Sequence, residues 1–208
     1  HNDLCRLLGR TWSAGEDLLK CREFALETHD GVYIRWQSVS SAEELRKLFL
    51  VKNVSKVHIG AIYDEQPSLR KKVVVNCVQR ELVFDIDIDD NGNLGLNAND
   101  IDECDRAWRL IALGIAIVAV ILEDKFGFVN MLTVYSGRRG AHLSVYDARA
   151  CSLTDEERCA IVDYMQPKGE KQPSKYGSIM NDGFFGNLWE YQLLPFWLDH
   201  GLVARDDG

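Results

Sequence analysis

The chain contains the stretch Glu81-Leu82-Val83-Phe84-Asp85-Ile86-Asp87-Ile88-Asp89-Asp90, in which apolar and acidic residues alternate from Phe84 to Asp89. A period of two predicts a β-strand with an apolar face and an acidic face. Residues i and i+2 on one face lie about 6.5–7 Å apart, so neighbouring carboxylates can lean together over divalent cations. Two such cations, roughly 3.5–4 Å apart, stabilise both sides of a phosphoryl transfer. The stretch therefore predicts a strand that can hold catalytic metals.

Two other interpretations of this acidic strand have to be weighed. A row of carboxylates is also typical of a solvated face, or of a sheet edge protected against aggregation. The start of a calcium-binding EF-hand loop is matched by Asp87, Asp89, Asn91 and Gly92. The twelfth position of that loop should be a bidentate Glu but is Ala98, and the preceding segment has a strand pattern instead of a helix. The calcium interpretation is therefore not favoured.

Length and composition restrict the class of protein. The chain has 208 residues, 46% of them hydrophobic, which predicts one domain or slightly more with a real core. The net charge of −8 argues against general attraction to nucleic acid, although a local basic groove remains compatible with it. The six cysteines are scattered without a C-x-x-C pair, as is typical of reduced thiols. No signal peptide is visible, and the first residue is His1, so we expect a piece of a longer protein.

The order of expected elements indicates the α+β class. Strands are expected at 21–26, 32–36, 57–63, 82–89, 131–135 and 141–146, and helices at 3–8, 16–20, 41–50, 101–125, 154–165 and 187–203. The helix at 101–125 is apolar nearly all round, so we expect it to be buried on most sides and packed on a sheet. Thr154 and Glu157 predict a capping box. We expect a core at 1–165, followed by a mobile loop and a helical portion within 166–208.

A second chemical signal is the loop Ser136-Gly137-Arg138-Arg139-Gly140-Ala141-His142. Glycine permits a close backbone approach to phosphate, and arginine offers a planar fork of donors for phosphate oxygens. In isolation such a loop is more typical of an exposed hairpin turn. If it lies on a strand beside the acidic strand, however, the two are complementary halves of one nucleotide site.

Taken together, several motifs resemble one protein family. They are Cys21-Arg22-Glu23-Phe24, Tyr33-Ile34-Arg35-Trp36-Gln37-Ser38, Ile59-Gly60-Ala61-Ile62-Tyr63, Glu81 to Asp87, Phe126-Gly127-Phe128, and Tyr135 to Gly140 with His142. Their order and spacing over roughly residues 20–165 resemble the small, catalytic subunit of archaeo-eukaryotic DNA primase, of the eukaryotic type.

The resemblance implies a fold, an activity and partners. The fold would be the primase (prim) fold, with a mixed β-sheet core flanked by helices and part of a C-terminal helical subdomain. The activity would be template-directed synthesis of short RNA primers from ribonucleoside triphosphates for DNA replication, with Mg²⁺ or Mn²⁺. The partners would be a single-stranded DNA template, the primase large subunit and the replicative polymerase complex, in the nucleus and without a membrane.

The resemblance also assigns roles to individual residues. Asp85 and Asp87 match the catalytic carboxylates that hold the metals. Other positions match nucleotide-binding residues of the family: Ser136, Arg138, Arg139 and His142 in the loop, and Arg35 and Glu23 lining the same cleft.

Two departures from the family pattern favour an alternative. The positions of the family's zinc knuckle read Asn97, Ala98, Cys104 and Ala107, and one thiolate cannot make a four-coordinate zinc site, so no structural zinc is expected there. The family's third catalytic Asp has no recognisable match. The alternative is a degenerate, catalytically inactive primase-like domain with a structural or interaction role. For the same reason we expect the 208-residue chain to be inactive by itself.

Overall fold

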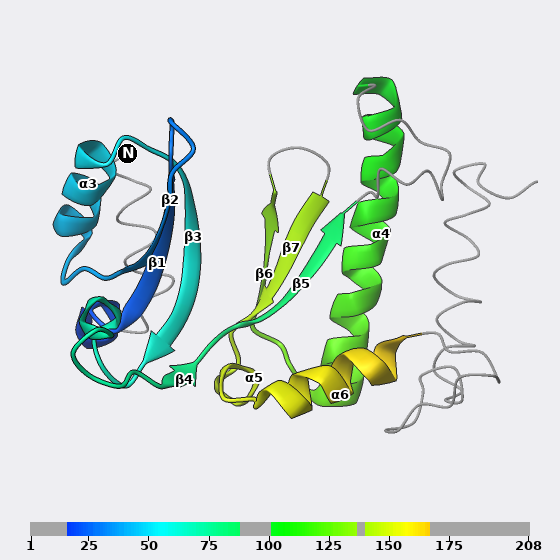
Figure 1. The fold of residues 1–208 in the computed structure, drawn as a ribbon. Coiled ribbons are helices and arrows are strands. Elements are labelled where there is room, and N and C mark those ends of the chain that lie inside the picture. Colours follow the sequence, from blue (N-terminus) through cyan, green and yellow to red (C-terminus); the bar gives the residue numbers. More distant parts are fainter. Residues whose placement is uncertain (1–15, 88–100, 137–139, 167–208) are drawn as a thin grey trace, which may run out of the picture. The chain divides into compact units, whose positions relative to one another are not determined.

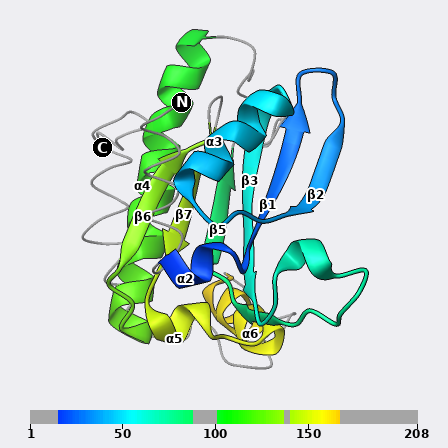
Figure 2. The ribbon, with the colours of Figure 1, turned by 90° about the vertical axis from the view of Figure 1, so that its left-hand side faces the viewer.

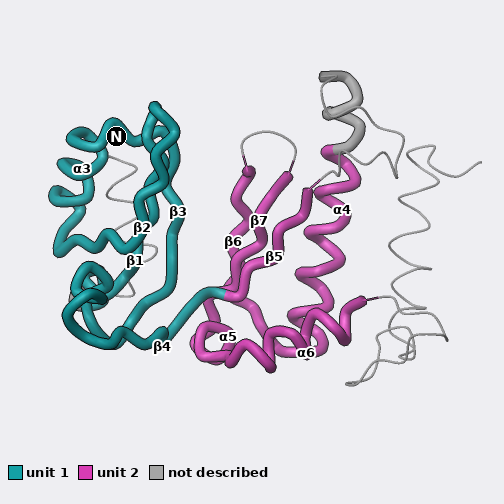
Figure 3. Tube along the Cα trace, in the orientation of Figure 1, with its two compact units in different colours: residues 1–81 teal, residues 82–208 magenta. Residues whose placement is uncertain are grey.

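The computed structural model describes residues 16–87, 101–136 and 140–166, and they form an α+β fold (Figure 1). The chain divides into two compact units, His1–Glu81 and Leu82–Gly208 (Figure 3). The α+β class expected from the sequence is confirmed. The helices expected at 3–8 and 187–203, and the loop and helical subdomain expected after residue 166, lie outside the described residues.

Unit 1 is built on a four-stranded antiparallel sheet in the order β2-β1-β3-β4. Its strands are β1 (Arg22–Thr28), β2 (Tyr33–Gln37), β3 (Val54–Tyr63) and β4 (Cys77–Gln79). Its helices are α2 (Glu16–Leu19), α3 (Ala42–Val51) and the short 3₁₀ turn η1 (Pro67–Leu69). The tight turn between β1 and β2 uses Gly31 at φ +82°, a conformation that glycine adopts without strain.

Helix α3 covers one face of the unit 1 sheet, as Figures 1 and 2 show. The helix begins where predicted, because the Ser41 side chain accepts a hydrogen bond of 3.2 Å from the backbone N–H of Glu44. Leu45 and Phe49 lie one turn apart and are buried on the same side of the helix. They join Leu26 of β1 in the core of the unit.

Unit 2 is built on a three-stranded antiparallel sheet in the order β5-β7-β6. The strands are β5 (Leu82–Asp87), β6 (Met131–Tyr135) and β7 (Gly140–Val145). Its helices are α4 (Ile101–Phe126), α5 (Ala148–Cys151) and α6 (Asp155–Met165). Strand β7 follows β6 by a hairpin but also pairs with β5, which precedes the whole of α4 in the chain.

Helix α4 packs along the unit 2 sheet and ends at Gly127, whose φ of +67° stops the helix as predicted. The sequence predicted a helix buried on most sides. Among its described side chains, however, full burial is limited to Ile111, Ile121 and Leu122, and Ala112 is exposed. Some of the apolar side chains pack toward the sheet, whereas Leu113, Ile117 and Ile121 pack with Tyr164 and Met165 of α6. Among the described residues, no helix has the length and apolar character needed to cross a membrane.

Helix α6 begins with the predicted capping box. The Glu157 backbone N–H donates to Thr154 Oγ1 at 3.2 Å, and the Thr154 N–H donates to the Glu157 carboxylate at 2.7 Å. The bond from the Thr154 backbone is the largest cause of a lowered pKa of Glu157, and a bond from the Thr154 hydroxyl to the same carboxylate is the next. Three elements were not predicted, namely β4, η1 and α5, because each is only three or four residues long.

Candidate functional site

The acidic strand adopts the two faces that its alternation predicts. In β5, Leu82 is buried, and Phe84 and Ile86 are half-buried. Asp85 and Asp87 are exposed. The apolar set packs toward α4, since Leu82 and Phe84 belong to the core cluster that contains residues of that helix. Both carboxylates therefore lie on the open face of the unit 2 sheet.

Strand pairing places the loop strand directly beside the acidic strand. Asp85 is opposite His142, and Asp87 is opposite Gly140, in the antiparallel ladder of β5 and β7. The His142 Nε2 atom lies 3.4 Å from Asp85 Oδ1, and the two side chains are 46% and 71% exposed. The condition set by the sequence, that the acidic strand and the loop strand be neighbours, is met.

The ends of the arginine loop are fixed at the same edge. The Ser136 backbone N–H donates to the Gly140 carbonyl oxygen at 2.9 Å, which closes the β6–β7 hairpin. Arg138 and Arg139 lie outside the described residues. Their loop ends at Gly140, which pairs with Asp87 at the carboxyl end of β5, and it starts from β6, on the other side of β7.

Gly140 is required by this close approach of strands. A Cβ atom at this position would lie 2.8 Å from the Ile86 carbonyl oxygen and 3.0 Å from Asp87 Oδ1. Both distances are shorter than ordinary contacts, so a side chain would push the acidic strand away from β7. The loop glycine thus also positions the carboxylate of Asp87.

The other two predicted site residues, Glu23 and Arg35, form an ion pair in unit 1 that is buried on the Glu23 side. The Glu23 side chain is 3% exposed, and its two oxygens accept bonds of 3.0 and 3.1 Å from Nε and Nη2 of Arg35. The same carboxylate accepts from the Trp36 backbone N–H at 3.1 Å and from the Tyr63 hydroxyl at 3.2 Å. Gly60 leaves room for it, since a Cβ there would lie 2.8 Å from Glu23 Cβ.

This arrangement changes the ionisation of its members. The hydrogen bonds that Arg35 donates to Glu23 raise the pKa of the Arg35 guanidinium above its ordinary value. Burial, followed by the negative charge of Glu23, raises the pKa of Tyr63 to about 12. Tyr63 therefore keeps its proton at neutral pH and donates a hydrogen bond to the carboxylate.

A second buried ion pair was missed by the sequence reasoning. Arg22 is 2% exposed, and its Nη2 lies 2.7 Å from Glu81 Oε1, while its Nη1 donates to the Gly60 carbonyl oxygen at 2.7 Å. Adjacent charged residues, Arg22 and Glu23, inside an otherwise buried strand were the available signal, because buried charges are normally paired.

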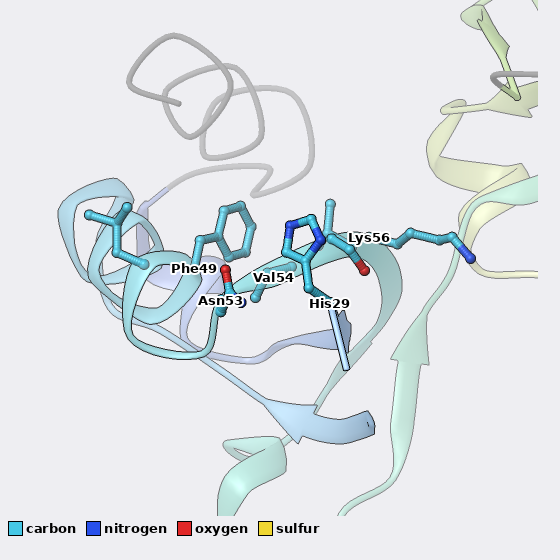
Figure 4. A pocket seen from close by; sticks show the side chains of 8 residues that line it. His29, Phe49, Asn53, Val54 and Lys56 are labelled. Atoms are coloured by element: carbon cyan, nitrogen blue, oxygen red, sulfur yellow. The ribbon is translucent and has the colours of Figure 1, made fainter. Parts of the chain in front are cut away.

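A cavity of about 220 Å³ lies elsewhere in unit 1 (Figure 4). Its lining includes His29, Phe49, Asn53, Val54 and Lys56, from the end of α3 and the start of β3. None of the predicted site residues lines it. The candidate site is therefore an open strand face and not this cavity.

Comparison with known proteins agrees with the motifs. The family model described as DNA primase small subunit matches residues 84–185, which include Asp85, Asp87 and His142. Similarity to curated relatives extends toward the N-terminus and takes in unit 1 as well. The chain belongs to the DNA primase small-subunit family.

The relatives include eukaryotic and archaeal DNA primase small subunits. The chain is 34% identical to the protein of Saccharomyces cerevisiae over 157 residues and 36% identical to that of Schizosaccharomyces pombe over 148 residues, which are 74% and 70% of the chain. It is 31% identical to the protein of Caenorhabditis elegans over 202 residues, or 92% of the chain. These matches cover 38%, 33% and 49% of the respective relatives, so the chain spans a third to a half of their length.

The donor atoms of this primase-family chain suit a hard divalent cation. Mg²⁺ prefers oxygen ligands and is usually held by one or two carboxylates together with substrate phosphates. Asp85 and Asp87 supply two exposed carboxylates on one face. Within residues 16–87, 101–136 and 140–166, no group of three His, Cys, Asp or Glu side chains could hold a metal. The two carboxylates thus fit a metal that a nucleotide helps to bind. The predicted zinc positions lie outside the side chains that the structure describes.

Proposed function

We propose that this chain carries the nucleotide-binding and catalytic face of a DNA primase small subunit. The reaction is template-directed synthesis of short RNA primers from ribonucleoside triphosphates. The observation that carries the proposal is the pairing of β5 with β7, which sets the carboxylates of Asp85 and Asp87 beside His142 and the ends of the arginine loop. Acidic and basic groups of these kinds are needed on opposite sides of a triphosphate.

The chemistry follows from the charges that develop. A primer 3′-hydroxyl attacks the α-phosphorus of the incoming nucleotide, and the bond to the leaving pyrophosphate breaks. Bound Mg²⁺ or Mn²⁺ would stabilise the attacking and leaving oxygens. Asp85 and Asp87 would hold the cations, and His142 would donate a hydrogen bond to a phosphate oxygen. Arg138 and Arg139, with Ser136, would bind the remaining phosphate charge.

Glu23 and Arg35, which lie in unit 1, are also proposed as nucleotide-binding residues. Arg35 is the member that can reach a ligand, because its side chain is 49% exposed while Glu23 is buried beneath it. Glu23 would then act by fixing the guanidinium. A template strand, the primase large subunit and the replicative polymerase complex are the proposed partners, in the nucleus.

A degenerate, inactive primase-like domain is the second candidate. It is favoured because the described residues bring no third metal-binding side chain to Asp85 and Asp87, whereas two-metal catalysis needs both ions held in place. The two candidates differ in one measurable property. A polymerase site binds a nucleotide in a metal-dependent way, whereas an inactive structural domain has no such requirement.

The test is binding of ATP and UTP to the purified chain by calorimetry, with and without Mn²⁺. We expect weak, Mn²⁺-dependent binding that Asp85→Ala and Asp87→Ala each abolish. Glu123→Ala is the matched control, because it removes an exposed carboxylate from α4 of the same unit. Nucleotide binding that does not depend on Mn²⁺, or that is retained in both aspartate variants, would contradict the metal assignment.

A second experiment addresses the reaction. In the complete small subunit with its large subunit, Asp85→Ala should abolish primer synthesis on a single-stranded template while Glu123→Ala leaves it unchanged. The 208-residue chain should make no primer alone, because two-metal transfer needs both ions held in place. Primer synthesis by the isolated chain that Asp85→Ala removes would show that another residue of this chain completes the metal site.

A further inference from the structure

Strand β2 contains a bulge at Arg35 and Trp36. In the ladder with β1, Phe24 is opposite Gln37 and Leu26 is opposite Ile34, so two residues of β2 face one residue of β1. Trp36 has a φ of +64°, which is rare for a bulky side chain and costs about 1–3 kcal/mol. Bulges of this kind change the direction in which a side chain points.

The strained backbone is held by the buried carboxylate beneath it. Glu23 accepts the Trp36 backbone N–H at 3.1 Å and also binds Arg35. Two guanidinium groups lie over the Trp36 ring, that of Arg35 at 4.7 Å and that of Arg70 at 4.8 Å from the ring centroid. Tyr63 packs against the same ring, with 5.6 Å between centroids. The bulge therefore builds a stack of one ring and two cations.

More positive charge follows Arg70 directly. Lys71 and Lys72 are exposed, and neither they nor Arg70 forms an ion pair with any carboxylate that the structure describes. The basic loop, residues 70–72, directly follows η1, and η1 is held beside the end of β2 by a hydrogen bond of 3.2 Å from the Ser38 hydroxyl to the Ser68 hydroxyl. On a chain with a net charge of −8, this is a local excess of cations.

We propose that the cluster of Arg35, Trp36, Arg70, Lys71 and Lys72 binds single-stranded nucleic acid. This inference rests on the proposed function and deepens it, because it names the part of unit 1 that contacts a template or primer strand. Consecutive cations bind successive phosphates, and unpaired bases stack on aromatic rings and guanidinium planes. A duplex offers the same phosphates but keeps its bases stacked inside, so the ring favours a single strand.

The charges support a ligand over a purely structural stack. Two guanidinium groups on one ring repel each other, and only Arg35 has a carboxylate to offset its charge among the described contacts. A phosphate placed near Arg70 removes that repulsion. The positive φ of Trp36 accompanies a ring position beside the basic loop, with the Arg70 guanidinium 4.8 Å from the ring centroid.

The first test measures binding of a labelled oligothymidylate to the full chain by fluorescence anisotropy over a range of salt. The triple change Arg70→Ala, Lys71→Ala and Lys72→Ala should weaken binding at least about tenfold. It should also lower the slope of log affinity against log salt by about 2, at roughly 0.7 for each lost phosphate contact. The control is Lys47→Ala with Lys52→Ala, two exposed lysines of unit 1, which should change neither quantity.

The second test removes the ring without losing the fold. Trp36→Gly relieves the positive φ, which offsets part of the lost contacts of the ring with Tyr63 and the two arginines, so thermal unfolding should still show a cooperatively folded chain. Its affinity for oligothymidylate should still fall about tenfold, while Trp36→Phe should retain part of it. Unchanged affinity in Trp36→Gly would overturn the role of the ring.

Competition identifies the ligand class. Unlabelled oligothymidylate or oligouridylate should displace the labelled strand better than duplex DNA or polyglutamate does. Which of these two single strands competes better shows whether the cluster prefers DNA or RNA. Equal displacement by duplex, or better displacement by polyglutamate, would overturn the proposal. Asp85→Ala should abolish Mn²⁺-dependent nucleotide binding and leave strand binding intact. Strand binding that is sensitive to the cluster without any nucleotide binding would therefore reject the proposed function and keep this inference.

Discussion

Two carboxylate sites in this chain have opposite environments. In unit 1, Glu23 is buried and accepts four hydrogen bonds, from Arg35, Trp36 and Tyr63. In unit 2, the Asp85 side chain is 71% exposed, and His142 approaches it at 3.4 Å. A carboxylate whose lone pairs are already occupied fixes its neighbours, whereas one that faces water keeps oxygen atoms for a cation. Charge on a strand therefore has a structural role in one unit and is available for chemistry in the other.

The largest expected effect is on the stability of the buried site. Glu23→Ala leaves the Arg35 guanidinium and two further donors without their acceptor. We expect a loss of about 3 kcal/mol in the free energy of unfolding, which is at the low end for breaking a buried ion pair because Arg35 is half exposed. Asp85→Ala and Asp87→Ala should each change the free energy of unfolding by less than about 0.5 kcal/mol. Urea denaturation of the three variants measures this difference, and equal costs would refute the contrast.

The next effect concerns how the exposed carboxylates are positioned. Gly140→Ala places a Cβ 2.8 Å from the Ile86 carbonyl oxygen, which should cost about 1–3 kcal/mol and weaken Mn²⁺-dependent nucleotide binding. Gly114→Ala is the control, since its Cβ would lie 3.4 Å from the Ile86 side chain and alanine suits a helix. It should be neutral or slightly stabilising. A harmless Gly140→Ala would mean that the strands approach each other less closely.

A smaller effect is expected when the exposed site loses its histidine. His142→Ala should lower nucleotide affinity about tenfold, or about 1.4 kcal/mol, because one contact to phosphate is lost. Affinity for oligothymidylate should stay unchanged. Titration with labelled nucleotide and labelled strand compares the two ligands. An equal loss for both would indicate a disturbed fold instead of a nucleotide contact.

The smallest effect is a pH dependence of the buried site. The ordinary pKa of 10.0 for Tyr63 is raised to about 12 in the folded chain, so folding favours the protonated phenol. Its contribution of about 1 kcal/mol should be complete below pH 10 and lost as the pH rises toward 12. The difference in unfolding free energy between the original chain and Tyr63→Phe should therefore shrink over that interval. A constant difference would contradict the raised pKa of Tyr63, to which burial contributes most and Glu23 next.

Local patterns in the sequence predicted most of the elements. The faces of β5, the cap at Ser41 and the capping box of α6 depend on residues within a few positions of each other. The division into two units was not predicted, and the expected 1–165 core remains untested. Short elements such as β4 and α5 carry too few residues for a period to be visible.

The candidate site was predicted only conditionally. The sequence indicated Asp85 and the arginine loop as site candidates. The pairing of β5 with β7, however, depends on packing against α4, which lies between the two strands in the chain. The burial of Glu23 was missed because its partners, Arg35 and Tyr63, lie in other strands of the sheet. Alternation indicates that a residue shares a face with its neighbours, but it does not tell which distant side chain covers that face.

The order β5-β7-β6 also has a consequence for how the chain folds. The β6–β7 hairpin is local and can form early, whereas β5 is separated from its partner by the whole of α4 and by β6, and closing so long a loop is slow. Asp85 therefore meets His142 only at a late step, when β5 docks on the hairpin. A partly folded chain has no assembled acidic and basic face, so the proposed site for metal and nucleotide would form only when the sheet is complete.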